Sequence, residues 1–409
     1  MQIAPILAAL KRSKTGAVLV VLQVALTLAI TSNILSIVQA RLALITRSTG
    51  VDTDNVFALG FRLDAGAITR ASRDADLAAV RAVPGVVDVV AANSYPLRGT
   101  GWVDGVSLTP GTKSIQEQNA SAAFYAMDEH AIPALGLALV EGSNFNANDS
   151  LEGNFNAGPM PNVAMVSEAL ARHLFPGASA LGKVLYVSSD ASRPVTVVGV
   201  VKTLQTPMAA GTIDSAVSDY SVMVPVHGGG SLGLYLVRVQ PGRLDITMGK
   251  VKQALSAVEP ARSFGKLKPL ADVRDAAYRK DRSLAIALSV VCLALVLVTV
   301  LGIVGLTSFW VSRRKRQIGV RRALGATGGA IARYFLLENA LLCTFGVLLG
   351  VVVAEALNAW LVMRYGVSHM PGWQLLASIA MVLLVGQLAA ATPAWRASRL
   401  PPTEALRAV

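Results

Sequence analysis

Cysteine, charge and aromatic side chains are all scarce in this chain. Of its 409 residues, only two are cysteine, 15% are charged and 6% are aromatic, whereas 53% are hydrophobic. So little charge excludes an ordinary soluble protein. Both cysteines, Cys292 and Cys343, fall inside apolar runs and are expected to act as small buried hydrophobes. An exported domain of this chain would therefore depend on its core rather than on disulfides.

Recognisable catalytic and metal-binding patterns are missing as well. The sequence has no H-E-x-x-H, no cysteine/histidine metal spacing and no G-x-S-x-G. An apparent phosphate loop, Gly177–Lys183, is followed by Val184 instead of Ser or Thr, and then by a strand pattern instead of a helix. We expect surface or structural roles for the four histidines, which are His130, His173, His227 and His369. The chain is thus predicted not to be an enzyme and to hold no cofactor or metal of its own.

What the sequence does contain is four long apolar runs. About 20 apolar residues cross a bilayer as a helix, so each run is long enough to span. The runs are Gly16–Val38, Leu284–Val311, Phe335–Val362 and Trp373–Ala394. The first is expected to be a retained anchor, because its 23 residues exceed the usual signal-peptide core of about 7–15.

The net charge of +12 is concentrated beside the ends of these runs. Basic residues crowd the N-terminus, the loop Ser312–Arg333 and the tail, whereas Gln39–Ser283 carries 23 basic and 22 acidic residues. This is the positive-inside pattern, reinforced by anionic lipid headgroups, and it does not indicate a nucleic-acid partner. We therefore predict that both termini are cytoplasmic and that residues 39–283 lie outside. Residues 1–15, with Ile3, Leu7 and Leu10 on one face, form an amphipathic helix on the inner leaflet or a frayed end.

Residues 39–283 have the alternating patterns of an α/β domain. Strands are predicted at 55–63, 85–91, 182–187, 195–201, 222–225 and 233–239, and helices at 72–82, 167–174 and 244–258. The first strand, helix and strand form a β-α-β unit, and the strands 222–225 and 233–239 with the following helix repeat that order. A middle piece, about 119–203, is predicted to be a subdomain inserted into the other. Leu270–Val311 has no helix breaker before Gly302, so a continuous helix of roughly 60 Å is expected there.

The basic loop 312–333 contains a short helical pattern over Gln317–Leu324. One interpretation is a coupling helix that docks into a groove on a cytoplasmic partner, with apolar residues buried there and arginines paired at the rim. The alternative is charge that only sets topology. The predicted coupling residues are Gln317, Ile318, Val320, Arg321, Arg322 and Leu324. Thr327 is expected to cap the next helix.

Polar and small residues inside the spans carry further predictions. Gly346, Gly350 and Ala354 form a small-residue ridge for close helix packing, either within the chain or across a dimer. Glu355 is an intramembrane acid, for which a gating role and a structural role both remain open. Glu338 is expected to pair with a loop arginine such as Arg333. Gln23, Asn33 and Gln387 are expected to form hydrogen bonds between helices.

The basic loop and two further segments closely resemble a known family. Arg314–Thr327 (RKRQIGVRRALGAT) and Pro393–Arg407 (PAWRASRLPPTEALR) are similar to the FtsX-like permease domain. Asn162–Val201 and the LVEG pattern of Ala138–Asp149 resemble the MacB-type periplasmic core. The resemblance implies a core domain over 39–283 and a permease domain over 284–409, with spans at 284–311, 335–362 and 373–394 after the first at 16–38.

This resemblance implies a non-catalytic permease subunit of a MacB/LolCE/FtsX-type ABC system in a bacterial inner membrane. Such a subunit transmits ATP-driven motion to its periplasmic domain for export or extraction of a cargo. Its partners would be a cytoplasmic ATPase that binds ATP and Mg²⁺, and a second permease copy or paralogue. A periplasmic adaptor and an outer-membrane channel are further candidates. MacB carries its ATPase before the first span, where this chain has fifteen residues, so a separate ATPase chain is expected. The alternative is an FtsX-like regulator of a periplasmic client such as a cell-wall hydrolase.

Overall fold

The computed structural model describes residues 14–64, 66–112, 117–153, 161–187, 190–209, 217–228, 231–365 and 369–399. The chain divides into two compact units. One comprises Met1–Ile45 with Lys280–Val409, and the other comprises Thr46–Arg279. Most of the predicted amphipathic N-terminus (residues 1–13) and the end of the tail motif (from residue 400) lie outside the described residues.

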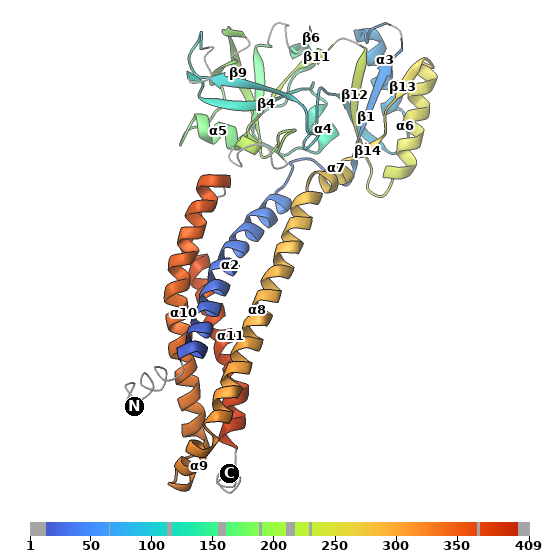
Figure 1. The fold of residues 1–409 in the computed structure, drawn as a ribbon. Coiled ribbons are helices and arrows are strands. Elements are labelled where there is room, and N and C mark those ends of the chain that lie inside the picture. The colour runs from blue at the N-terminus through green and yellow to red at the C-terminus, as the bar shows by residue number, and fades with distance from the viewer. Residues whose placement is uncertain are drawn as a thin grey trace. The chain divides into compact units, whose positions relative to one another are not determined.

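The first unit is a bundle of helices. Its elements are α2 (Lys14–Thr46), α8 (Arg279–Arg313), α9 (Lys315–Ala323), α10 (Gly328–Tyr365) and α11 (Gly372–Ser398). Four of the described helices, α2, α8, α10 and α11, are long and apolar enough to cross a membrane. They run beside one another in Figure 1 and share a core that includes Leu28, Ile303, Cys343 and Ala390, one from each helix.

Hydrogen bonds between helices supplement this apolar packing. They join Gln23 Nε2 to Val298 O (2.9 Å), Thr27 Oγ1 to Thr299 Oγ1 (2.7 Å), Asn33 Nδ2 to Ala354 O (3.1 Å) and Asn339 Nδ2 to Gly386 O (3.0 Å). The predicted interhelical roles of Gln23 and Asn33 are thereby confirmed. The Gln387 amide lies beside the backbone of Leu336 and Ala340 on α10. Such bonds contribute about 0.6–2 kcal/mol each between membrane helices, so they mainly fix which faces meet.

The second unit contains a five-stranded antiparallel sheet covered by two helices. The strands are β1 (Val56–Leu63), β2 (Val86–Ala91), β12 (Leu232–Val239), β13 (Arg262–Phe264) and β14 (Lys268–Pro269), and the helices are α3 (Arg70–Arg81) and α6 (Leu244–Val258). One β-α-β unit is β1-α3-β2, and the other is β12-α6-β13. The two units are interleaved in the strand order β13-β1-β12-β2, since β12 lies between β1 and β2. Leu77, Val80, Val251 and Leu255 of the helices bury one face of the sheet.

A seven-stranded sheet is inserted between β2 and β12. Its strands are β3 (Trp102–Ser107), β4 (Ala120–Ala126), β5 (Leu139–Gly142), β7 (Val163–Ser167), β8 (Val184–Val187), β9 (Asp190–Val201) and β10 (Ser221–Val224). The strand β8 pairs with both β3 and β9, so all of these strands except β5 form a closed ring. We call this part the barrel subdomain. Phe124, Val166, Leu185 and Val222 are among the residues that fill it.

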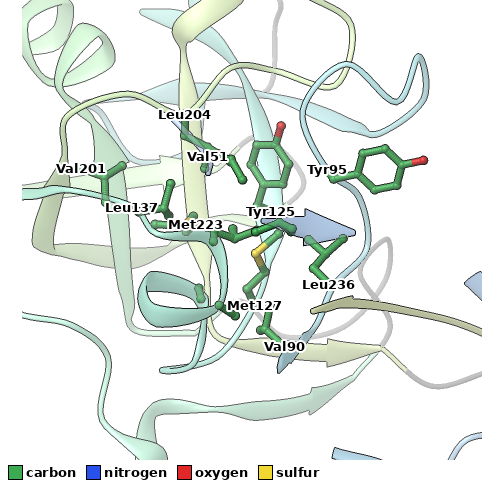
Figure 2. Close-up of a cluster of buried hydrophobic side chains, with 14 of the residues drawn as sticks. Val51, Val90, Tyr95, Tyr125, Met127, Leu137, Val201, Leu204, Met223 and Leu236 are labelled. Atoms are coloured by element: carbon green, nitrogen blue, oxygen red, sulfur yellow. The ribbon is translucent and has the colours of Figure 1, made fainter. Parts of the chain in front are cut away.

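Shorter elements complete this unit. They are α4 (Ala131–Leu135), α5 (Glu168–Leu174), α7 (Leu270–Ala277), the 3₁₀ turns Ala147–Asp149 and Val217–Asp219, and a two-stranded sheet of β6 (Leu151–Gly153) and β11 (Val226–Gly228). A second core lies between the five-stranded sheet and the barrel subdomain. Figure 2 shows Tyr125 and Met127 from the barrel subdomain with Val90 and Leu236 from the five-stranded sheet in this cluster.

Three expectations from the sequence need correction. The inserted sheet runs from β3 to β10 and so exceeds the predicted range of about 119–203, because the short strand at Trp102–Ser107 lies among glycines. The strands 221–224 and 232–239 belong to different sheets and do not repeat the first β-α-β unit. The predicted continuous helix is broken at Tyr278, whose ring is buried to 2% exposure and whose ψ of 6° ends α7.

Candidate functional site

The basic loop folds as a short helix between α8 and α10. Arg314 precedes α9 and Leu324 follows it, and Gly325 then turns with a φ of 92°. A left-handed φ after the helix suits glycine, which has no Cβ. The Thr327 side chain accepts a hydrogen bond from the Ala330 N–H (3.3 Å), which confirms the predicted cap of α10.

The apolar residues of α9 point in two directions. Ile318 is 5% exposed and packs with Val311, Phe335 and Ala397 of the same chain. This is a correction to the idea that Ile318 enters a partner's groove, since its side chain anchors α9 to the bundle. Val320 and Leu324 are 45% and 83% exposed.

Four exposed residues of α9 and its C-terminal end share one helix face. Gln317, Val320, Arg321 and Leu324 follow the spacing of neighbours on a helix surface, and all four are exposed. Arg321 also lies over the Tyr334 ring at 5.2 Å, which fixes its position at the edge of this face. Arg322 is half-buried beside it. We call Gln317, Val320, Arg321 and Leu324 the α9 face.

A buried ion pair holds the corner between α8 and α9. Arg314 Nη1 donates to Glu338 Oε2 of α10 at 2.8 Å, and the carboxylate is almost fully enclosed. Glu338 therefore pairs with a loop arginine as predicted, but with Arg314 instead of Arg333. Because a buried charge is stable only when it is compensated, this pair limits where α9 can begin.

The small-residue ridge of α10 packs against α2 of the same chain. A Cβ added to Gly346 would lie 2.7 Å from Val24 Cβ, and one added to Gly350 would lie 3.0 Å from Ala25 Cα. Ala354 is fully buried, and its carbonyl accepts from Asn33. This face is thus filled within the chain.

Glu355, the residue after Ala354, is exposed. The polar residue that faces inward is Asn358, which donates to Asn33 Oδ1 (3.3 Å) and accepts from the Met370 N–H (3.3 Å). The described residues provide Glu355 with neither an ion-pair nor a hydrogen-bond partner. Its role stays a prediction.

The second unit contains a buried polar cluster that the sequence did not predict. Arg73 forms a bidentate ion pair with Glu152, and His227 lies 3.7 Å from Asp128. Burial lowers the pKa of His227 and raises the pKa of Asp128, whereas the hydrogen bond from Arg73 lowers the pKa of Glu152. Arg73 and His227 also line a cavity of about 50 Å³. No local motif announces this cluster, because its members are far apart in the sequence.

Nothing in the described part of the chain groups three or more His, Cys, Asp or Glu side chains around a metal position. The apparent phosphate loop Gly177–Lys183 leads into the strand β8, as predicted, so no helix N-terminus faces it.

Comparisons with known proteins agree with this architecture. The MacB-like periplasmic core domain family matches residues 16–258, and the FtsX-like permease C-terminal family matches residues 289–402. The uncharacterized ABC transporter permease YknZ of Bacillus subtilis is 23% identical over 81% of this chain and 78% of its own length. The macrolide export ATP-binding/permease protein MacB is 26% identical in Chromobacterium violaceum and 27% in Agrobacterium fabrum, over 76% and 78% of this chain. The chain spans about half the length of these MacB proteins (47% and 49%).

Two solved structures are also similar. The match to the extracellular domain of YknZ from Gram-positive bacteria covers 52% of this chain and 100% of that domain, with 16% identity and a TM-score of 0.32. The match to the periplasmic region of MacB from Actinobacillus actinomycetemcomitans covers 57% of this chain and 97% of that region, with 16% identity and a TM-score of 0.34.

Four apolar helices, a large α/β domain and a basic loop helix define a membrane permease of the ABC transporter class. Since the MacB-like match extends over more than half of the chain, the chain belongs to the family of permeases with a MacB-like periplasmic core domain and an FtsX-like permease domain. The α/β domain of the second unit is accordingly its periplasmic domain.

Proposed function

We propose that this permease transmits motion from a cytoplasmic ABC ATPase to its periplasmic domain, where a cargo is exported or extracted. The observation that carries the proposal is the α9 face, because α9 is anchored by Ile318 and Arg314 yet exposes Val320, Arg321 and Leu324. A short helix fixed on one side and exposed on the other is suited to dock into a groove of a partner. The ATPase would bind ATP and Mg²⁺, and the permease would contribute no catalytic residue.

In this proposal the loop and both termini lie in the cytoplasm of a bacterium, and the chain is in the inner membrane. The seven basic residues of 312–333 support this orientation. Labelling of exposed lysines in intact cells provides the check. Modification of Lys183 and Lys250 from outside supports the orientation, whereas modification only after the inner membrane is opened would contradict it.

The docking role is tested by the double substitution Val320→Ser and Leu324→Ser. We expect the ATPase to be lost from the purified complex while the permease still inserts into the membrane. The matched control is Ile246→Ser with Val258→Ser, which also replaces two exposed aliphatic residues of one helix, α6, and should retain the ATPase. Normal ATPase recovery with the α9 double variant would refute the docking role.

A second permease copy is part of the proposal. Exposed apolar side chains follow one stripe of α8, at Ile286, Val290, Leu293, Leu297 and Leu301. Their spacing of three and four residues is typical of a helix seam that packs against another helix. We propose this stripe, the α8 stripe, as the dimer contact. The client is identified by what co-purifies: an adaptor or lipoprotein supports export or extraction, and a cell-wall hydrolase supports the FtsX-like regulator.

A further inference from the structure

The barrel subdomain has no direct covalent connection to the membrane helices. From α2 the chain passes through residues 47–55 into β1, and it returns through β14 and α7 to α8. Both β1 and β14 belong to the five-stranded sheet, and the barrel subdomain lies between β2 and β12 in the chain. The chain itself therefore reaches the barrel subdomain only by way of the five-stranded sheet, and direct transfer from the two connecting segments requires non-covalent contacts.

Those contacts converge on Gln205, in the loop that follows β9. Its backbone N–H donates to Thr49 O (3.0 Å) in the segment that enters from α2. Its side-chain Oε1 accepts from the Tyr278 hydroxyl (3.5 Å), directly before α8. Its carbonyl accepts from the hydroxyl of Tyr125 on β4. The entering segment, the leaving segment and a central barrel strand thus meet at one residue.

The hydrogen bonds of Gln205 are shielded from water. Gln205 and Tyr125 are 0% exposed, and Tyr278 is 2% exposed, so water does not compete for these hydrogen bonds. The Gln205 Nε2 is also buried and has no hydrogen-bond partner among the described residues. This arrangement therefore leaves one donor unsatisfied, and a shifted arrangement that supplied an acceptor would recover that hydrogen bond.

Neighbouring contacts connect the same segments. A Cβ on Gly50, whose φ is 84°, would lie 1.8 Å from Thr203 O, so the entering segment approaches the loop as closely as only glycine permits. Arg47 forms an ion pair with Asp219 of the insertion, and Arg274 of α7 donates to the Arg47 carbonyl (3.3 Å).

Apolar packing surrounds this junction. Figure 2 shows Val51 and Leu204 beside the Tyr125 ring, one from the entering segment and the other next to Gln205 in the chain.

We propose that Gln205 is the positioning residue through which displacement of the two membrane-connected segments moves the barrel subdomain relative to the five-stranded sheet. This inference rests on the proposed function, since it assigns the path of the transmitted motion. The rival path is the broad apolar core between the two sheets, which connects them by packing alone.

The test measures the distance between the two parts in the full chain, purified in lipid nanodiscs with its ATPase. Cys292 and Cys343 are replaced by alanine, and spin labels are attached at Lys183→Cys on the barrel subdomain and Lys250→Cys on α6. Both lysines are exposed. The distance is recorded without nucleotide and with ATP and vanadate. The variants are Gln205→Leu and Tyr278→Phe, and the matched control is Tyr95→Phe, another buried tyrosine, which makes no hydrogen bond to Gln205 in the described structure.

We expect ATP and vanadate to shift the distance in the parent protein and in Tyr95→Phe. Gln205→Leu and Tyr278→Phe should lose most of the shift while retaining the ATPase and a parental melting temperature. A full shift in folded Gln205→Leu would overturn the inference, and if that variant does not fold, a full shift in Tyr278→Phe would overturn it. A parent protein that hydrolyses ATP without any shift would instead overturn the proposed transmission, and this inference with it.

Discussion

Arg314 and Glu338 join the start of the loop helix α9 to the helix α10. The guanidinium donates to the carboxylate at 2.8 Å, and the two side chains are 18% and 2% exposed. The second oxygen of Glu338 has no hydrogen-bond partner among the described residues, so Arg314 provides its charge compensation there. This ion pair gives the basic loop a structural role.

Removal of Arg314 should therefore destabilise the protein more than removal of another loop cation. Arg314→Leu leaves an uncompensated buried carboxylate, which typically costs about 3–5 kcal/mol. The double change Arg314→Leu with Glu338→Leu should recover most of that loss. Lys315→Leu, at an exposed neighbour, is the control and should change stability little. Thermal unfolding in detergent checks the order, and equal melting temperatures for Arg314→Leu and Lys315→Leu would contradict it.

Substitution of the glycine ridge tests packing within the chain. A Cβ at Gly346 would meet Val24 at 2.7 Å, so Gly346→Ala should separate α10 from α2 and destabilise by about 1–3 kcal/mol. Gly305→Ala on α8 meets nothing within 4 Å and should be neutral or stabilising, because alanine is favoured over glycine in helices. Melting temperatures of the two variants give the comparison. Equal stability would show that α2 does not occupy this ridge.

The α8 stripe predicts which surface a second copy contacts. In a cysteine-free background, Leu293→Cys should form a disulfide-linked dimer under mild oxidation. Leu348→Cys is the control, since it is a comparably exposed leucine on α10 (61% against 69% for Leu293). Non-reducing electrophoresis of membranes is the measurement. If only the α10 cysteine cross-links, the dimer contact has been assigned to the wrong helix.

His227 should make the stability of the periplasmic domain depend on pH. Burial lowers its pKa below the ordinary 6.5, so the unfolded chain takes up the proton first as the pH falls. The stabilising contribution of neutral His227 is thus fully present above about pH 6.5 and is lost as the pH falls towards its lower folded value. Asp128, whose pKa is raised, changes stability in the opposite direction, and the other charged neighbours of His227 are Arg73, Glu152 and Asp74.

The contribution of His227 is isolated by comparison with His227→Gln. The difference in melting temperature between the parent and this variant should shrink as the pH is lowered from 7.5 to 5.5. His173→Gln, at an exposed histidine, is the control for the loss of an imidazole at the surface. A parental advantage that grows on acidification would mean that the protonated form of His227 is the one stabilised.

Much of this architecture follows from local sequence patterns. Long runs without charge predict the membrane helices, because a helix needs a minimum length to cross the bilayer. The clustering of basic residues marks the loop 312–333 as a connection between two such helices. Local patterns located the helices α3, α5 and α6 of the periplasmic domain, but only six of its fourteen described strands, namely β1, β2, β8, β9, β10 and β12. Thr327 was identifiable as a cap because capping depends on adjacent residues.

Other properties depend on residues that are distant in the sequence. The helix pattern of α9 marks Ile318 and Val320 as equally apolar, and only the neighbouring helices decide that Ile318 is buried while Val320 is exposed. The break at Tyr278 is invisible in a segment free of glycine and proline, because it arises when a distant core accepts the tyrosine ring.

The sequence by itself determined the class of the protein, since span length, charge placement and strand or helix period are properties of neighbouring residues. Tertiary structure alone decided the closure of the barrel, the partner of Glu338 and the meeting of three segments at Gln205. These are decided by the packing of segments that are distant along the chain, such as those of Thr49, Gln205 and Tyr278, and no local pattern encodes which of them meet.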